Sequence, residues 1–495
     1  MPPNTTPNTY IGIDLGTSAV KVLLVDSEGK VLSTASESYP VIYPKSGWSE
    51  QNPADWRRGT FAAIKTVLNG FDRNSVKGIS FGGQMHGLVM LDSADNVIRP
   101  AILWNDGRTQ AETDHLNNDI GKTRLSALTA NIAFAGFTAP KLLWVRDHEP
   151  ENYAKIAKIM LPKDYLAYVL SGAFATDLSD ASGMLLLDVA RRRWSPEMCE
   201  ICGVNPAWLP ALHESYETIG TLAPAAAAEL GLSPDVKIIA GAGDNAAAAV
   251  GTGAVADGSC NISLGTSGTI FISTDAFSVD AQNALHSFCH ANGRHHLMGC
   301  TLSAASCSKW WVEDILKSGH AAEEAAIAQH LGCNEVYFLP YLMGERSPHN
   351  DTLARAAFIG MRPDTTREKF TLAVMEGVMF GLKDCLDIAR ANGVKIASTR
   401  ICGGGAKSKI WREIAANIFG MPVETLAVEE GPAYGAAMLA MVGCGEYATV
   451  TEAAAALVKT GKTVQPDPAL TAAYAARHAI FRKLYPALKD AFAAM

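Results

Sequence analysis

β-prone runs alternate with helical stretches along the first half of the chain. We expect strands within residues 11–25, 29–39, 78–81 and 88–91, and helices over 53–68, 141–147 and 162–171. A buried strand over 236–240 then leads into a glycine turn and a further helix, which ends by 251–253. Alternation of this kind predicts a mixed α/β domain.

The second half of the chain repeats this plan. We expect hairpins within residues 260–300 and helices over 304–317, 367–392, 409–420 and 434–442. Because the helix that ends by 251–253 separates the two halves, we predict one domain over residues 1–253 and a second over 254–495.

One short motif is present in both halves. Leu15-Gly16-Thr17-Ser18 recurs about half a chain later as Leu264-Gly265-Thr266-Ser267, and both copies lie between β-prone runs. Each copy predicts a β-hairpin whose Gly-Thr-Ser turn presents backbone N–H groups and two hydroxyls, which suit phosphate oxygens. Asp14 precedes the first copy, whereas Ser263 precedes the second. Two phosphate clips with one carboxylate between them predict a nucleotide and a divalent metal at the seam of the two domains. The alternative is a chance echo between two ordinary hairpins.

Composition excludes several classes of function. The 495 residues are 48% hydrophobic and 19% charged with a net charge of −8, which leaves no general basic field for nucleic acid or anionic lipid. No apolar run approaches the ~20 residues of a membrane span, and residues 1–8 lack the basic and apolar regions of a signal peptide. We therefore expect a cytoplasmic protein that binds neither nucleic acid nor membrane.

The ten cysteines are expected to be reduced thiols. Cys199 and Cys202 have no second pair to complete four zinc ligands. Cys289, His290 and the histidines after them straddle a hairpin turn at 292–293, where alternate side chains point to opposite faces. We predict that neither cluster holds zinc.

The duplicated plan with its phosphate hairpins resembles the superfamily of actin, the heat-shock chaperone ATPases and the sugar kinases. Residues 136–145, GFTAPKLLWV, are similar to one signature of the FGGY family of carbohydrate kinases, and residues 358–377 are similar to the other. With the paired hairpins, the resemblance covers essentially the whole chain. It implies an α/β fold of two duplicated RNase H-like domains with an interdomain cleft.

The glycine turn at 241–246 also fits the GxGxxG/A pattern of dinucleotide-binding folds. The Asp244 carboxylate would, however, lie where a pyrophosphate must lie, and no acid follows about twenty residues later to hold a ribose. At a helix N-terminus Asp244 is expected to stay ionised through the helix dipole and to accept a proton. The resemblance assigns this catalytic role to the Gly-Asp-Asn turn, which also brings Asn245 to the substrate. The alternative is a plain N-cap.

The loop 82–87 contains Met85 and His86 between glycines that let the backbone approach a ligand. Followed by Trp104, Asp106 and Arg108, it is interpreted as the wall of a polar sugar pocket with an aromatic platform. His86 alone would more often be a structural histidine. Together the two segments resemble the branch of the family that phosphorylates xylulose.

The glycine run 403–408 is not a Walker A loop, because Ala406 precedes its lysine. In the resemblance it is the adenosine motif, in which Gly404, Gly405 and Ser408 let the adenine and ribose lie against the backbone. The alternative is a simple turn at a helix start. Residues 431–437 resemble the second interdomain connector of the family.

The resemblance thus implies an ATP-dependent kinase that converts D-xylulose to D-xylulose 5-phosphate. The hairpins at 16–18 and 265–267 would grip phosphates, Asp14 would hold Mg²⁺ through water, and Asp244 would accept the hydroxyl proton. The alternatives are a kinase for another ketose or polyol, such as ribulose, ribitol, fuculose or glycerol, and a non-catalytic actin-like or chaperone-like nucleotide switch. The expected partners are the sugar and ATP, and a homodimer is left open.

Overall fold

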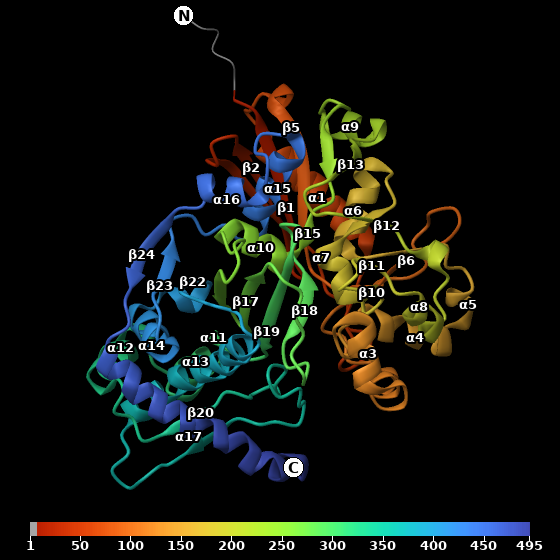
Figure 1. Cartoon of the computed structure of the whole chain (residues 1–495). Coiled ribbons are helices and arrows are strands. Elements are labelled where there is room, and N and C mark those ends of the chain that lie inside the picture. Colours follow the sequence, from red (N-terminus) through yellow and green to blue (C-terminus); the bar gives the residue numbers. More distant parts are fainter. Residues whose placement is uncertain (1–6) are drawn as a thin grey trace, which may run out of the picture. The chain divides into compact units, whose positions relative to one another are not determined.

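The computed structural model describes residues 7–495 (Figure 1). Contacts group these residues into two compact units. Unit 1 contains the chain up to Val255, Ser287–His295 and Glu430–Val458, and unit 2 contains Ala256–His286, His296–Glu429 and Lys459–Met495. The chain therefore crosses between the units several times, whereas we predicted one boundary after residue 253. The difference arises because helix α15, Gly431–Cys444, packs against the first strands of the chain.

The sheet of unit 1 has the strand order β13-β14-β5-β1-β2-β3, with β15 also paired to β5. The strands are β1 Thr9–Leu15, β2 Ala19–Asp26, β3 Val31–Ser38, β5 Val76–Gly83, β13 Thr218–Thr221, β14 Lys237–Ile239 and β15 Ala242–Gly243. β2 lies between β1 and β3 and is antiparallel to both, while β5 runs parallel to β1 and β14 parallel to β5. This sheet holds the predicted strands within 11–25, 29–39 and 78–81.

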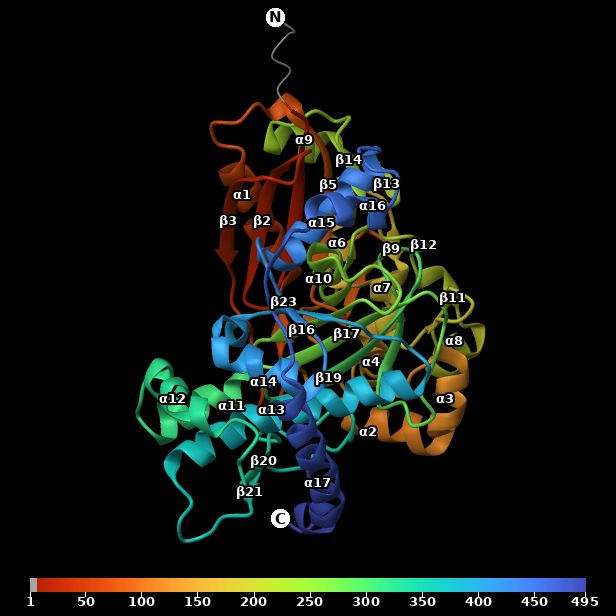
Figure 2. The same ribbon diagram turned by 60° about the vertical axis from the view of Figure 1, so that its left-hand side comes forward.

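Helices cover this sheet, as its nearly continuous burial requires. Helix α1, Pro53–Val67, lies against β2 and β3 (Figure 2). Helix α15 lies against β1 and β5 and also packs on α10, Asp244–Thr252 (Figure 1). The approach of α15 needs glycine, because a Cβ atom on Gly12 would lie 1.9 Å from the carbonyl oxygen of Ala433. A Cβ atom on Gly435 would lie 1.8 Å from the carbonyl oxygen of Ala247.

The second sheet, most of whose strands lie in unit 2, repeats the same order. It runs β18-β19-β17-β16-β22-β23-β24, so that β19, β17, β16, β22 and β23 correspond to β3, β2, β1, β5 and β14. The strands are β16 Cys260–Leu264, β17 Gly268–Thr274, β18 His286–Cys289, β19 His295–Thr301, β22 Thr399–Cys402, β23 Val423–Leu426 and β24 Thr460–Val464. β16 and β17 are antiparallel, like β1 and β2, and β22 runs parallel to β16, as β5 does to β1. The predicted duplication of an α/β fold is confirmed.

The larger helices of unit 2 form its core with this sheet. They are α13 Arg367–Ala391, α14 Lys409–Phe419 and α17 Pro468–Ala493, and α14 packs between the other two. The helix predicted over 304–317 is instead a short α11, Ala305–Lys309, that continues as a π-helix over Trp310–Ile315. No helix within residues 7–495 is both long and apolar enough to span a membrane.

The remaining elements are short. In unit 1 they are β4 Glu50–Gln51, β6 Val89–Leu91, β7 Ala101–Ile102, α2 Gln110–Asp114, α3 Lys122–Thr129, α4 Thr138–His148, α5 Pro150–Tyr153, β8 Lys158–Met160, α6 Pro162–Ser171, β9 Ala175–Asp177, α7 Leu178–Ala181, β10 Leu187–Asp188, β11 Arg193–Trp194, α8 Pro196–Cys202, β12 Ala211–His213, α9 Pro224–Leu230 and α16 Val450–Leu457. In unit 2 they are α12 His320–Ile327, β20 Tyr337–Leu339 and β21 Ala357–Ile359.

Candidate active site

Parallel strand pairing brings two predicted acids of unit 1 to the same edge of the sheet. Asp14 is the last residue but one of β1, and it pairs with Gly82 of β5. β15 pairs with β5 on the other side, with Gly243 opposite Gly83, and Asp244 follows directly. The carboxyl ends of parallel strands are where ligands bind in open α/β sheets. Asp14 and Asp244 therefore occupy the edge at which a substrate is expected.

The two carboxyl groups influence each other's protonation. Burial raises the pKa of Asp14 to about 7, the charge of Asp244 adds to this effect, and Lys21 opposes it. Burial also raises the pKa of Asp244 to about 6, although the backbone N–H and side-chain amide of Asn245 donate to its Oδ1 at 2.7 and 2.8 Å. We predicted an Asp244 held ionised by the helix dipole; burial outweighs that effect, and the pKa lies above its ordinary value.

Asp244 is not the N-cap of its helix. The N-cap of α10 is Gly243, which has no capping side chain. The N-cap alternative for Asp244 is therefore wrong. An ionisable carboxyl at a strand end with a pKa near neutrality has the protonation behaviour that a general base requires.

The first Gly-Thr-Ser turn connects β1 and β2, as predicted, and is held by several side chains. Tyr39 Oη donates to the carbonyl oxygen of Gly16 at 2.6 Å, and Gln51 Nε2 donates to that of Thr17 at 2.6 Å. Thr17 Oγ1 donates to Gln84 Oε1 at 3.1 Å and accepts from Trp104 Nε1 at 2.9 Å. The Thr17 hydroxyl therefore ties the turn to two predicted sugar-binding segments.

The Ser18 hydroxyl of this turn is exposed, in contrast to that of Thr17. We expect a phosphate group to meet Ser18 and backbone N–H groups rather than the Thr17 side chain. Gln51 and Tyr39 were not predicted at the site. They lie outside the motif in sequence: Gln51 belongs to β4, and Tyr39 directly follows β3, which pairs with β2.

His86 is held in an unusual backbone conformation. Its φ is +69°, a left-handed value that non-glycine residues seldom adopt. The imidazole Nδ1 lies 2.8 Å from the carbonyl oxygen of Gly183, and the ring stacks on Phe137 at 4.6 Å. Lys141 Nζ and Thr138 Oγ1 both donate to the His86 carbonyl oxygen, at 2.8 and 3.1 Å. Strain that is held this firmly is common at functional sites.

Met85, the neighbour of His86, packs beside the turn that precedes Asp244. A Cβ atom on Gly243 would lie 3.0 Å from Met85 Cγ and Sδ. The Met85 side chain thus fills the space beside Gly243, which has no side chain of its own. The structure brings Met85, His86 and Asp244 into one region of unit 1.

Asp106 and Arg108 bind each other. Arg108 Nη2 lies 2.7 Å from Asp106 Oδ2, and both side chains are fully buried. The guanidinium lies 3.8 Å from the centre of the Trp48 ring, and the backbone N–H of Ser49 donates to Asp106 at 2.6 Å. The pair therefore braces the segment that carries Trp104, whose side chain is 41% exposed. Trp104 is the member of this group that the geometry leaves accessible to a ligand.

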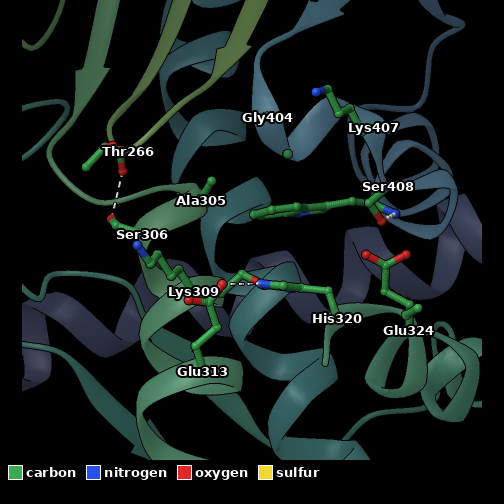
Figure 3. Close-up of a pocket in the computed structure, with 14 residues that line it drawn as sticks. Thr266, Ala305, Ser306, Lys309, Glu313, His320, Glu324, Gly404, Lys407 and Ser408 are labelled. Atoms are coloured by element: carbon green, nitrogen blue, oxygen red, sulfur yellow. Dashed lines mark hydrogen bonds and ion pairs between the residues drawn. The ribbon is translucent and has the colours of Figure 1, made fainter. Parts of the chain in front are cut away.

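Unit 2 contains a cavity of about 570 Å³ beside the adenosine motif (Figure 3). It is lined by Thr266, Ala305, Ser306, Ser308, Lys309, Glu313, His320, Ala321, Glu324, Gly404, Gly405, Lys407, Ser408 and Trp411. Gly405 has no room for a side chain, because a Cβ atom there would lie 2.9 Å from the Trp411 ring and 3.0 Å from Leu264. Ser408 caps α14 by accepting from the N–H of Trp411 at 3.1 Å. The run 403–408 is thus both a helix-start turn and one wall of a cavity.

The opposite wall of this cavity carries ionisable side chains that we did not predict. Figure 3 shows Lys309, Glu313, His320 and Glu324 across from Gly404, with His320 Nε2 lying 3.2 Å from Glu313 Oε1. These residues belong to α11, the π-helix and α12. Their spacing has no recognisable motif, so the sequence offered no signal for them.

The second Gly-Thr-Ser turn lies at the edge of the same cavity and connects β16 and β17, as predicted. The N–H of Ala305 donates to the carbonyl oxygen of Gly265 at 2.8 Å, and Ser306 Oγ donates to that of Thr266 at 2.7 Å. The Thr266 side chain is exposed, and Ser267 is partly buried. The start of α11 thus fixes the turn next to the cavity.

Within residues 7–495 no group of three or more histidine, cysteine or acidic side chains is arranged to hold a metal ion. His290 is engaged with the backbone, because its Nε2 lies 2.9 Å from the carbonyl oxygen of Ala254 and its Nδ1 accepts from Ala291 N at 2.8 Å. Cys199 and Cys202 lie in α8, and burial raises the pKa of both thiols.

The duplicated sheets and the paired sites define a class of protein. Residues 9–251 match the N-terminal domain of the FGGY family of carbohydrate kinases, and residues 260–444 match its C-terminal domain. The chain belongs to the FGGY family of carbohydrate kinases.

Several relatives are similar to this chain along nearly its whole length. It is 41% identical over 489 residues to the xylulose kinase of Escherichia coli strain K12, in an alignment that covers 97% of this chain and 99% of that protein. A crystal structure described as a xyloylose kinase from Brucella ovis is 38% identical and superimposes with a TM-score of 0.92, covering 98% of this chain and 100% of the other. The structure of a gluconate kinase from Lactobacillus acidophilus gives a TM-score of 0.94 at 26% identity, covering 99% and 100%.

Proposed function

We propose that this chain transfers the γ-phosphoryl group of ATP to the terminal hydroxyl of D-xylulose, which yields D-xylulose 5-phosphate and ADP. The observation that carries the proposal is the partly buried Asp244 carboxyl, which directly follows β15 beside the loop of Met85 and His86 and has a pKa raised to about 6. The similarity to a named xylulose kinase along nearly the whole chain supports the choice of sugar.

In this mechanism Asp244 accepts the proton of the attacking hydroxyl. The sugar oxygen forms a bond to the γ-phosphorus while the bond from that phosphorus to the bridging oxygen breaks, and ADP leaves. Such transfers need little covalent chemistry from the protein, so positioning and charge stabilisation supply most of the rate. Met85 and His86 orient the sugar, and Trp104 presents an accessible ring edge beside it.

Asp14 suits a divalent cation. Its carboxyl lies at a strand end where burial and then the charge of a second carboxylate, Asp244, raise its pKa, and oxygen ligands are those that Mg²⁺ prefers. With few protein ligands nearby, the ion would keep most of its waters, so Asp14 is proposed to hold it through water. When bound, Mg²⁺ would neutralise charge on the phosphate oxygens.

The nucleotide is proposed to occupy the cavity of unit 2. Gly404 and Gly405 would let the adenine lie against the backbone, and the turn at 265–267 would meet the phosphates from this unit. The turn at 16–18, in unit 1, is proposed as a second phosphate-binding turn. ATP is the co-substrate that membership of a carbohydrate kinase family implies.

A coupled assay of ADP release tests the proposal. D-xylulose should exceed D-ribulose, ribitol, glycerol and D-gluconate in kcat/KM by about 10²-fold or more wherever a buried polar partner is left without its hydroxyl. Asp244→Asn should lower kcat by about 10²- to 10⁴-fold, as expected for loss of a general base. The exposed Asp235→Asn is the matched control and should behave as wild type.

Two results would count against the proposal in different ways. If another polyol or sugar outran D-xylulose, the choice of sugar would be wrong while the kinase assignment stood. If no sugar stimulated ADP release, the nucleotide-switch alternative would be favoured instead.

A further inference from the structure

A charged cluster is buried beneath the proposed sugar site. The Lys163 ammonium, at the start of α6, is fully buried and lies 2.6 Å from Asp164 Oδ1, 2.8 Å from Asp177 Oδ1 and 3.6 Å from Asp180 Oδ2. Lysine is almost never fully buried unless it is paired. Here one ammonium faces three carboxyl groups, none of which we assigned to the site from the sequence.

Such a cluster is a poor source of stability. Removing ions from water costs several kcal/mol each, so a buried ion pair often contributes little net stabilisation. Burial alone would lower the pKa of Lys163, but the neighbouring carboxylates raise it above its usual range. Burial raises the pKa of Asp180 well above its usual range. The role of the cluster is therefore better inferred from the residues that it holds in place than from its contribution to stability.

One carboxylate of the cluster connects to the catalytic turn. Asp177 Oδ2 accepts from Ser179 Oγ at 2.5 Å, and from the backbone N–H of Ser179 at 2.8 Å. The Ser179 hydroxyl oxygen in turn accepts from the backbone N–H of Gly243 at 3.2 Å. Gly243 immediately precedes Asp244 and is the N-cap of α10, which has no capping side chain. A single hydroxyl therefore joins the buried ion pair to the residue before the proposed base.

The same segment reaches the sugar loop. The helix α7 that begins after Asp177 continues into a 3₁₀ turn, Ser182–Met184, and the Gly183 carbonyl oxygen of this turn lies 2.8 Å from His86 Nδ1. Strand β5, which leads into the sugar loop, also lies close to Lys163, because a Cβ atom on Gly83 would lie 2.7 Å from Lys163 Cβ. The segment 177–183 therefore contacts both the sugar loop and the turn that carries Asp244.

We propose that Ser179, anchored by the buried Lys163–Asp177 ion pair, is a positioning residue that fixes Asp244 through the Gly243 amide. The inference rests on the proposed function, because it takes Asp244 as the proton acceptor. A displacement of the base of about 1 Å is enough to cost a large factor in rate. The Ser179 hydroxyl is bonded to the buried ion pair on one side and to the Gly243 amide on the other. These two bonds limit such a displacement.

The chain offers a matched pair of variants. Ser215 Oγ donates to the same oxygen, Asp177 Oδ2, at 2.7 Å, and both serines are fully buried. Only the Ser179 hydroxyl, of these two, also accepts from Gly243. Ser179→Ala and Ser215→Ala therefore remove equivalent bonds to Asp177, but Ser179→Ala alone frees the catalytic turn.

The test measures kcat and KM for D-xylulose and for ATP in both variants, together with their thermal unfolding. We expect Ser179→Ala to lower kcat by about 10- to 100-fold with the KM for ATP within about twofold. Ser215→Ala should keep kcat within about twofold while losing a similar amount of thermal stability. A merely structural role would lower stability alike in both and would not separate their kcat values.

Asp244→Asn, measured in parallel, distinguishes the two levels of the argument. Equal kcat values for the two serine variants, with Asp244→Asn strongly impaired, would overturn the positioning role and leave the proposed function intact. An Asp244→Asn variant with near wild-type turnover would instead remove the base itself, and with it the proposed function.

Discussion

At the scale of single residues, the chemistry of the site depends on two carboxyl groups whose pKa values are displaced upward. Because a base must be deprotonated, kcat/KM for D-xylulose should fall about tenfold per pH unit below about pH 6, the pKa of Asp244. Asp14, with a pKa near 7, interacts with Asp244, so the measured limb belongs to the pair. The check is a pH–rate profile at saturating ATP. The residual activity of Asp244→Asn should lack this limb, and an unchanged limb would assign it to another group.

His86 is proposed to contact the substrate with its ring, and its backbone is left-handed. Two variants of this residue distinguish the role of the ring from that of the backbone. His86→Ala should raise the KM for D-xylulose, because it removes the ring that bonds Gly183 and stacks on Phe137, while the KM for ATP stays nearly constant. At φ +69° alanine keeps the steric strain, whereas glycine relieves it. His86→Gly should therefore be the more stable of the two variants by about 1 kcal/mol, as measured by chemical denaturation. Equal stability would show that the loop relaxes out of the left-handed conformation.

The sequence indicated candidate site residues, but it did not indicate which side chains contact one another. Asp244, Met85 and His86 were singled out because their motifs are local, and their roles stay predictions. The engagement of Asp106 with Arg108, and of Thr17 with Gln84 and Trp104, could not be predicted, because it depends on which side chain turns toward which neighbour. The Lys163 cluster combines residues of α6, β9 and α7 that no short motif unites.

At the scale of elements, the hairpins and most helices followed from the pattern of apolar residues. The two Gly-Thr-Ser turns were predicted because β-prone runs flank each of them. The sequence analysis assigned no element to α17, although its buried Tyr474, Phe481 and Tyr485 recur at helical spacing. It also missed the π-helical stretch after Lys309, because a change in helix type has no distinct apolar period.

The contact between α10 and α15 should tolerate no added methyl group. In Gly435→Ala the new Cβ would lie 1.8 Å from the Ala247 carbonyl oxygen, and relief requires the two helices to move apart. We expect a loss of about 1–3 kcal/mol or more in the free energy of unfolding, measured by urea denaturation. Gly319→Ala is the control, because nothing lies within 4 Å of its added Cβ. Equal stability of the two variants would mean that the helices separate at little cost.

At the scale of the whole molecule, the two groups of candidate site residues lie in different units, with Met85, His86 and Asp244 in unit 1 and the cavity beside residues 403–408 in unit 2. Because the fold is shared with a gluconate kinase at a TM-score of 0.94, the arrangement of strands does not select the sugar. Under the proposed function, selection would lie in side chains of unit 1 such as Met85, His86 and Trp104, and the cavity of unit 2 would hold the nucleotide. Family membership thus defines the reaction class, and we propose that the residues of one loop select the substrate.

Hydrogen exchange should distinguish the two sites. D-xylulose alone should slow amide exchange in residues 82–87 and 241–245, and a non-hydrolysable ATP analogue alone should slow it in 403–411 and 305–320. At ligand concentrations near 100 times Kd, the protection of amides that exchange only from a ligand-free state should approach ~100-fold. Protection by D-xylulose confined to the second pair of segments would contradict the assignment of the sugar to unit 1.

The return of residues 430–458 to unit 1 affects how the protein is made. A ribosome that has synthesised the strands β1, β2 and β5 must still translate most of unit 2 before α15 emerges. Until then, the face of β1 around Gly12, where α15 packs, lacks its cover. Unit 1 therefore completes its core only after most of unit 2 has been translated, and the nascent chain carries an unfinished apolar surface through most of its synthesis.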